Sequence, residues 1–179
     1  MKILGIDPGI GRTGYALLEQ IGNQITLKEC GCITTGAGKP EHERLSEIKH
    51  DLNALIRKMR PDAICIESLF FFKNAKTVMS VAQARGVALV TAADHKLKII
   101  EVTPLQVKIA ATGYGKADKR QVQRMIQTLL KLKKIPKPDD AADAVAIDVE
   151  CGWRHVPLVL FQRTQTAELF VAMPTVDSE

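Results

Sequence analysis

The chain has 179 residues, of which 46% are hydrophobic and 25% are charged, and its formal net charge is +5. This length and composition predict one folded domain that forms a core without cross-links. No apolar run approaches the ~20 residues of a membrane-spanning helix, and the N-terminus enters a predicted strand at once. We therefore expect no transmembrane segment, no signal peptide and a cytoplasmic location.

The four cysteines form no C-x-x-C pair, and Cys30, Cys32 and Cys65 lie inside predicted strands. We expect all four, including Cys151, to be small residues in a reducing compartment, and neither disulfides nor zinc ligands. The four histidines are scattered singly, which favours surface or packing positions over metal ligation.

The first fifteen residues predict two strands joined by a tight, glycine-rich turn. An apolar run at residues 3–6 ends on Asp7, Pro8-Gly9 forces the turn, and Gly11 and Gly14 leave little side-chain bulk. A phosphate or a metal ion can approach such a carboxylate closely. The alternative is an ordinary hairpin whose aspartate bonds its own turn amides.

The remaining pattern alternates strands with helices in a single domain over residues 1–152. The order is a bulged strand at 25–34, an amphipathic helix at 41–59, an apolar strand at 63–67, a helix of small residues at 74–93, a strand at 98–102, a short helix at 104–111, a basic helix opened by Ala117 or Asp118, and a last helix opened by residues 139–140. Residues 153–179 lack clear periodicity and are treated as a tail of unknown role.

Carboxylates recur where these elements end or begin. If the first and fourth strands are parallel neighbours, Asp7 and Glu67 leave the sheet at the same edge. Asp140 and Asp143 lie one helical turn apart and share a face. Clustered carboxylates repel one another, and Mg²⁺ resolves that conflict by taking oxygen ligands. Helix capping is the alternative for Asp139 and Asp140, but it does not explain the whole set.

A block of positive charge lies between residues 116 and 137, where eight lysines and arginines accompany one aspartate. The segment therefore carries +7 and the rest of the chain −2. A solvated helix face is one explanation, and a polyanionic partner such as nucleic acid is the one we favour. Three phenylalanines at 70–72 either plug the core or contact unstacked bases.

Six short motifs together resemble the RuvC-type Holliday-junction resolvases. They are G-I-D-P-G at 5–9, R-T-G at 12–14, I-E at 66–67, Q-A-R-G-V-A at 83–88, Q-V-K at 106–108 and D-A-A-D-A-V-A at 140–146. Each motif is weak alone, but the set is specific in order and spacing. Asp139 beside the last motif and the segment after Trp153 have no counterpart in the family pattern.

The resemblance implies an RNase H-like α/β fold, a mixed five-stranded sheet with helices on both faces. It implies a homodimer that cuts two opposing strands of a four-way junction symmetrically, with two Mg²⁺ ions per site and beside a branch-migration motor. The expected products carry 5′-phosphate and 3′-hydroxyl ends. The implied catalytic and metal-binding residues are Asp7, Glu67, Asp140 and Asp143.

The resemblance also suggests Lys108 and Lys119 as phosphate contacts, Phe70 as the aromatic residue near the junction centre, and helix 74–93 as the dimer-forming element. Lys116 and Arg120 join this DNA-binding set from the basic segment. Two other function classes remain open. An actin-like ATPase or sugar kinase shares the acid–glycine hairpin but needs two such lobes, and a non-catalytic junction-binding scaffold does not need four carboxylates.

Overall fold

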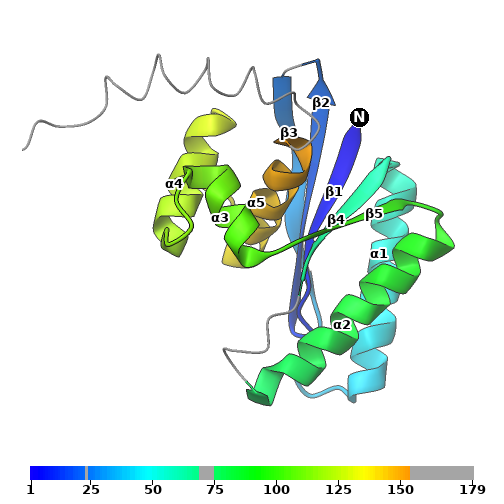
Figure 1. Ribbon diagram of the computed structural model, residues 1–179. Helices are drawn as coiled ribbons and strands as arrows, with labels where there is room; N and C mark the ends of the chain where they lie inside the picture. Colours follow the sequence, from blue (N-terminus) through cyan, green and yellow to red (C-terminus); the bar gives the residue numbers. More distant parts are fainter. Residues whose placement is uncertain (23, 69–74, 154–179) are drawn as a thin grey trace, which may run out of the picture.

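The computed structural model describes residues 1–22, 24–68 and 75–153, which form an α/β domain around one sheet (Figure 1). The sheet has the order β3-β2-β1-β4-β5. Its strands are β1 (Lys2–Asp7), β2 (Arg12–Ile21), β3 (Gln24–Thr34), β4 (Ala63–Glu67) and β5 (Lys98–Val102). Strands β1, β3, β4 and β5 match the predicted apolar segments to within one residue at either end, and β2 extends further than its apolar pattern.

The sheet is mixed, as predicted. Strands β1, β2 and β3 form an antiparallel meander, whereas β4 runs parallel to both β1 and β5. The predicted irregularity in the third strand is a register shift at Leu17/Leu18, where Leu17 faces Glu29 and Leu18 faces Leu27. The parallel pairing of β1 with β4 is the arrangement that brings Asp7 and Glu67 to the same edge.

Helices cover both faces of the sheet (Figure 1). On one face lie α1 (Glu41–Met59) and α2 (Ala75–Asp94), packed on Leu4, Ile6, Ile64 and Ile66. The opposite face carries α5 (Asp139–Trp153), with α3 (Pro104–Thr112) and α4 (Lys119–Leu129) outside it. Successive strand residues point to opposite faces, so apolar runs in β1 and β4 supply both cores.

Two helix starts follow their capping chemistry. Thr103 caps α3 and Asp118 caps α4, each in a reciprocal capping box with a glutamine three residues later. The expected capping role of Asp139 is wrong. Because α5 already begins at Asp139, the Pro138 carbonyl accepts the first helical hydrogen bonds and the Asp139 side chain is left to form ion pairs.

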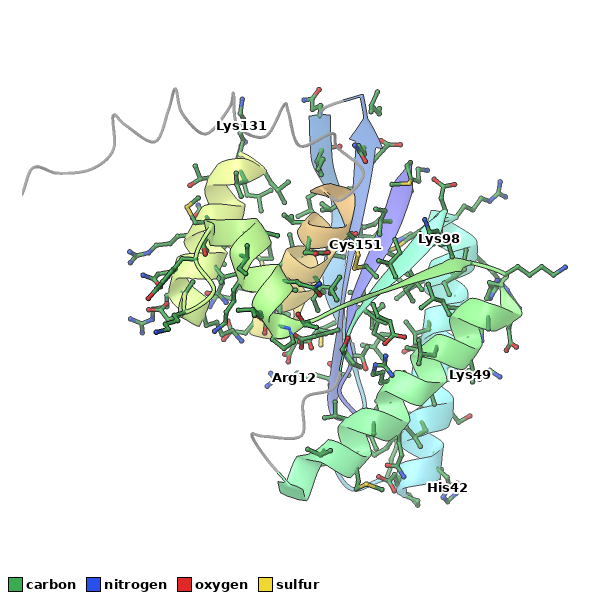
Figure 2. The ribbon with its side chains drawn as sticks, in the orientation of Figure 1. Arg12, His42, Lys49, Lys98, Lys131 and Cys151 are labelled. Carbon is green, nitrogen blue, oxygen red and sulfur yellow. A yellow bond between two sulfur atoms is a disulfide. The ribbon has the colours of Figure 1, made fainter. Side chains whose placement is uncertain are left out.

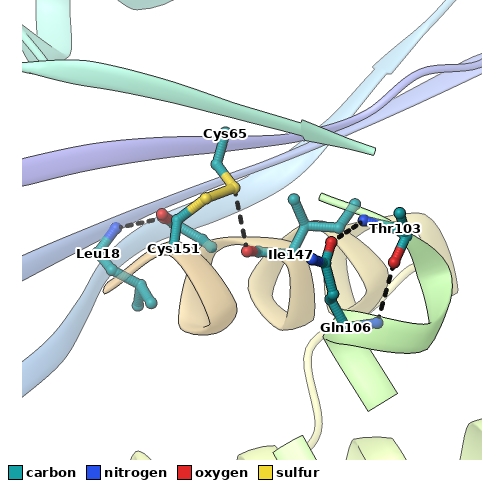
Figure 3. Close-up of a disulfide and its surroundings, with 7 residues drawn as sticks. Leu18, Cys65, Thr103, Gln106, Ile147 and Cys151 are labelled. Carbon is teal, nitrogen blue, oxygen red and sulfur yellow. Dashed lines mark hydrogen bonds between the residues drawn. A yellow bond between two sulfur atoms is a disulfide. The ribbon is translucent and has the colours of Figure 1, made fainter. Parts of the chain in front are cut away.

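The expectation that no cysteine forms a disulfide is also wrong. Cys65 of β4 and Cys151 of α5 are joined by a disulfide, with their Cα atoms 6.3 Å apart (Figure 3). The two residues are 86 positions apart in sequence and carry no spacing motif, so only the packing of α5 on β4 brings them together. Cys30 and Cys32 are free thiols.

Among the described residues, no helix combines the length and apolarity needed to cross a membrane. Two sequence-based expectations lie outside the described residues: the role of Phe70 and the character of the tail from residue 154 onward.

Candidate active site

The ends of β1 and β4 place two carboxylates side by side. In the parallel ladder Ile6 is opposite Ile66, so the next residues, Asp7 and Glu67, are neighbours at the same edge. Ile3 and Cys65 contribute to the core on the α5 face. Because side chains alternate along a strand, Asp7 and Glu67 belong to that same face.

Two glycines let α5 lie directly against β1 and β2. A Cβ atom on Gly5 would meet the Ala144 carbonyl oxygen at 2.5 Å, and one on Gly14 would meet the Asp140 carbonyl oxygen at 2.0 Å. No other residue type fits these positions without a shift of the helix. This close packing carries Asp140 and Asp143, at the start of α5, over the strand ends.

A buried acid fixes α5 further along. The Asp148 carboxylate accepts a hydrogen bond of 2.9 Å from the backbone N–H of Leu18, next to the register shift in β2–β3. Burial raises the pKa of Asp148 well above its usual range. No sequence pattern predicts this role, because an aspartate amid apolar helix residues has no motif that reveals its partner.

The electrostatics show that the four predicted acids share one environment. Burial raises the pKa of Asp7 to about 8, and the negative charges of Asp143, Glu67 and Asp140 add to the effect. The pKa of Glu67 rises to about 7 through burial and the charge of Asp143. Burial also raises the pKa of Asp143, although its hydrogen bond with Lys119 opposes that shift.

Basic side chains pair with the acids of α5. Arg12 Nε lies 3.2 Å from Asp140 Oδ2, and Lys119 Nζ lies 2.7 Å from Asp143 Oδ2. Figure 2 shows Arg12 at the end of β2 remote from the β2–β3 turn. The exposed Asp139 is 3.8 Å from both Lys119 and Lys137. Arg12 belongs to the R-T-G motif at 12–14, but the motif alone predicts no role for it.

The chemistry of these donors fits a hard divalent cation. The pKa values of Asp7 and Glu67 are raised because negative charges gather there without enough positive charge to offset them. A divalent cation would supply that charge, and carboxylate oxygens are the ligands that Mg²⁺ prefers. As the side chains lie in the described residues, however, no group of three or more acidic, histidine or cysteine side chains is placed to hold a metal ion. The two α5 carboxylates instead form ion pairs, Asp140 with Arg12 and Asp143 with Lys119.

Comparison with known proteins agrees with this geometry. The family model described as crossover junction endodeoxyribonuclease RuvC matches residues 3–151, which include all four acids. The chain belongs to the RuvC family. The members of this family are hydrolases that act on DNA, and their fold is RNase H-like, so the expected fold class is confirmed.

Relatives of this RuvC-family chain match over most of their length. A crossover junction endodeoxyribonuclease RuvC from Finegoldia magna is 50% identical over 147 residues, covering 82% of this chain and 90% of that protein. One from Pelotomaculum thermopropionicum is 47% identical over 155 residues, covering 87% and 94%.

Two solved structures of Thermus thermophilus RuvC have the same fold as this chain. The protein alone has a TM-score of 0.78 at 31% identity and covers 86% of this chain and 95% of its own. The complex with a Holliday junction substrate has a TM-score of 0.79 at 32% identity, covering 84% and 92%.

Among the predicted DNA-binding residues of this RuvC-family chain that the structure describes, Lys119 contacts the acid cluster directly. Lys119 is the first residue of α4 and contacts Asp143, and Arg120 follows it on the exposed surface. Lys116 is exposed just before α4, and Lys108 is half-buried on α3. Their DNA contacts stay predictions, as do the boundary at residue 152 and the catalytic roles of the four acids.

Proposed function

We propose that this chain is a Mg²⁺-dependent endonuclease that resolves four-way DNA junctions. The observation that carries the proposal is the group of half-buried carboxylates of Asp7, Glu67, Asp140 and Asp143 at one sheet edge, with Asp7 at a pKa of about 8. Membership in the RuvC family supports this choice over an actin-like ATPase, sugar kinase or scaffold.

The four carboxylates would hold two Mg²⁺ ions. Asp7 lies close enough to the other three acids for their charges to raise its pKa. Such ions, when bound, stabilise the attacking and leaving oxygens of a phosphodiester displacement. Asp7 and Glu67 would supply ligands from the ends of β1 and β4, and Asp140 and Asp143 would supply ligands from the start of α5. The glycine-lined hairpin leaves room for a DNA phosphate to reach them, and in-line attack would leave 5′-phosphate and 3′-hydroxyl ends.

DNA binding would rest on the basic residues around α3 and α4. We propose phosphate contacts for Lys108, Lys116, Lys119 and Arg120, because phosphate contacts position a protein on DNA and are strongly salt-dependent. Lys119 would link DNA binding to the acid cluster, since its ammonium group contacts Asp143 at 2.7 Å. Phe70 at the junction centre is part of the same proposal.

A homodimer would supply the two active sites that paired cuts need. Helix α2 presents Met79 and Val90 to solvent, 69% and 54% exposed. They are eleven residues apart, which is about three helical turns, so they share one side of α2. A second copy of the chain would cover this apolar side. A branch-migration motor as partner and a cytoplasmic location complete the proposal.

The test is incubation of a labelled four-way junction and a linear duplex of the same arms with the protein and Mg²⁺ or EDTA. We expect Mg²⁺-dependent nicks at paired positions in opposing strands of the junction, and none in the duplex. Equal cutting of both substrates would refute junction specificity. Tight junction binding without cutting at any Mg²⁺ concentration would instead identify a scaffold.

A further inference from the structure

Arg85 contacts the main chain of a candidate metal ligand. It lies in the middle of α2, on the sheet face opposite α5, and its side chain is only 16% exposed. Its Nε–H donates a hydrogen bond of 3.1 Å to the carbonyl oxygen of Glu67. The same guanidinium forms an ion pair with Glu101 of β5, which is 53% exposed.

The hydrogen-bond partners at the end of β4 explain why this contact matters. Glu67 is the last residue of β4, and beyond it the backbone N–H of Ser68 donates to the Val102 carbonyl of β5 at 2.7 Å. Arg85 binds the preceding carbonyl group, that of Glu67 itself. The peptide group between Glu67 and Ser68 is thus held at both its oxygen and its nitrogen.

The chemistry of the guanidinium makes the Arg85 contact a directional one. Arginine presents several N–H donors in a rigid planar fork, and a hydrogen bond from a charged donor is stronger than a neutral one. Glu101 lies opposite Ile66 in the β4–β5 ladder and fixes one edge of the fork while Nε reaches Glu67. A lysine has a single ammonium group and cannot reproduce both contacts in this planar geometry.

We infer that Arg85 is a positioning residue that fixes the main chain at Glu67 and thereby aims its carboxylate at the cation site shared with Asp7 and Asp143. This inference rests on the proposed function for the role of Glu67. It also gives α2 a direct contact with the site: the exposed side of α2 carries Met79 and Val90, whereas Arg85 faces the sheet.

The test compares Arg85→Lys and Glu101→Gln with the control Asp94→Ala, which removes another ion pair of α2, the one with Lys49 at 3.3 Å. Three quantities are measured: junction cleavage rate, junction affinity in EDTA, and Mn²⁺ binding to the DNA-free protein by calorimetry. Loss of one hydrogen bond to a charged donor corresponds to a cleavage rate about ten- to a hundredfold lower.

We expect Arg85→Lys to show that loss and several-fold weaker Mn²⁺ binding, with unchanged junction affinity. Glu101→Gln should change both quantities in the same direction, by less, and Asp94→Ala should change neither. If Arg85→Lys fails to fold, Glu101→Gln alone decides. Cleavage and Mn²⁺ binding equal to those of the control would overturn the inference. A wild type that binds Mn²⁺ but cuts no junction would refute the proposed function, while the Mn²⁺ comparison would still test Arg85.

Discussion

Asp7 shows what a single residue contributes and what its surroundings add. Its place after an apolar strand and before a glycine-rich turn is visible in the sequence, whereas its electrostatic state depends on the fold. Burial and three other acids raise the pKa of Asp7 to about 8, so the metal-free protein keeps a proton there at neutral pH. A divalent cation bound at this site would replace that proton, because its positive charge offsets the negative charges of the clustered carboxylates.

This pKa shift predicts how the metal-free protein responds to pH. The unfolded chain loses the Asp7 proton near pH 3.8, whereas the folded protein holds it up to about pH 8. Between these values the folded state binds more protons, so the free energy of unfolding should fall as pH rises, by up to about 1.4 kcal/mol per pH unit for one proton. Asp7→Asn should flatten this slope. Thermal unfolding in EDTA from pH 5.5 to 8 measures it, and parallel profiles for the two proteins would contradict the shift.

The neighbouring acids Asp139 and Asp140 should separate cleanly on mutation. Asp140 raises the pKa of Asp7 and pairs with Arg12, whereas Asp139 is exposed and pairs with Lys119 and Lys137. We expect Asp140→Asn to lose most junction cleavage at every Mg²⁺ concentration, because a ligand is gone. Asp139→Asn, the matched control, should retain it. The reverse result in a cleavage assay would mean that Asp139 is the ligand.

At this scale the acids and Lys119 were identified from the sequence, whereas Arg12 and Arg85 were not. Asp7, Glu67, Asp140 and Asp143 each stand at the end or beginning of an element, which is a pattern visible in one dimension. Arg12 and Arg85 act through ion pairs and a backbone contact between elements distant in sequence, and no spacing reveals such partners.

At the scale of elements, the docking of α5 on the β1–β2 hairpin builds the site. The helix at 41–59 and the strands at 63–67 and 98–102 were predicted to the residue, because their apolar periodicity is unbroken. The contacts that hold α5 against the sheet were not predicted. The disulfide from Cys65 to Cys151 and the buried Asp148 both join α5 to the sheet, and both depend on packing that a sequence pattern does not encode.

We expect the docking of α5 to be most sensitive to mutation at Gly14. Its Cβ would lie 2.0 Å from the Asp140 carbonyl oxygen, so Gly14→Ala must push α5 and its acids away from the hairpin. We expect a loss of about 1–3 kcal/mol in the free energy of unfolding, typical of overpacking, and much slower cleavage. Gly38→Ala is the control, because its Cβ would meet nothing within 4 Å. Denaturant unfolding and junction cleavage that leave the two variants alike would refute the tight docking of α5.

In the whole molecule, positive and negative side chains would serve two different tasks, which are DNA binding and cation binding. The segment from residue 116 to 137 carries +7 and would bind DNA phosphates, while the four acids at the sheet edge would hold the cations that hydrolyse the phosphodiester. Lys119 lies where the two meet. Binding and cutting should therefore be separable properties carried by different residues.

The most direct test of this account is Asp7→Asn on a labelled four-way junction, with affinity measured in EDTA and cleavage measured in Mg²⁺. Asparagine is nearly isosteric with aspartate but carries no charge for the cation site. We predict that the variant binds the junction at least as tightly as the wild type and makes no paired cuts. Cutting near the wild-type rate in Mg²⁺ would contradict the assignment of the acid cluster as the catalytic centre.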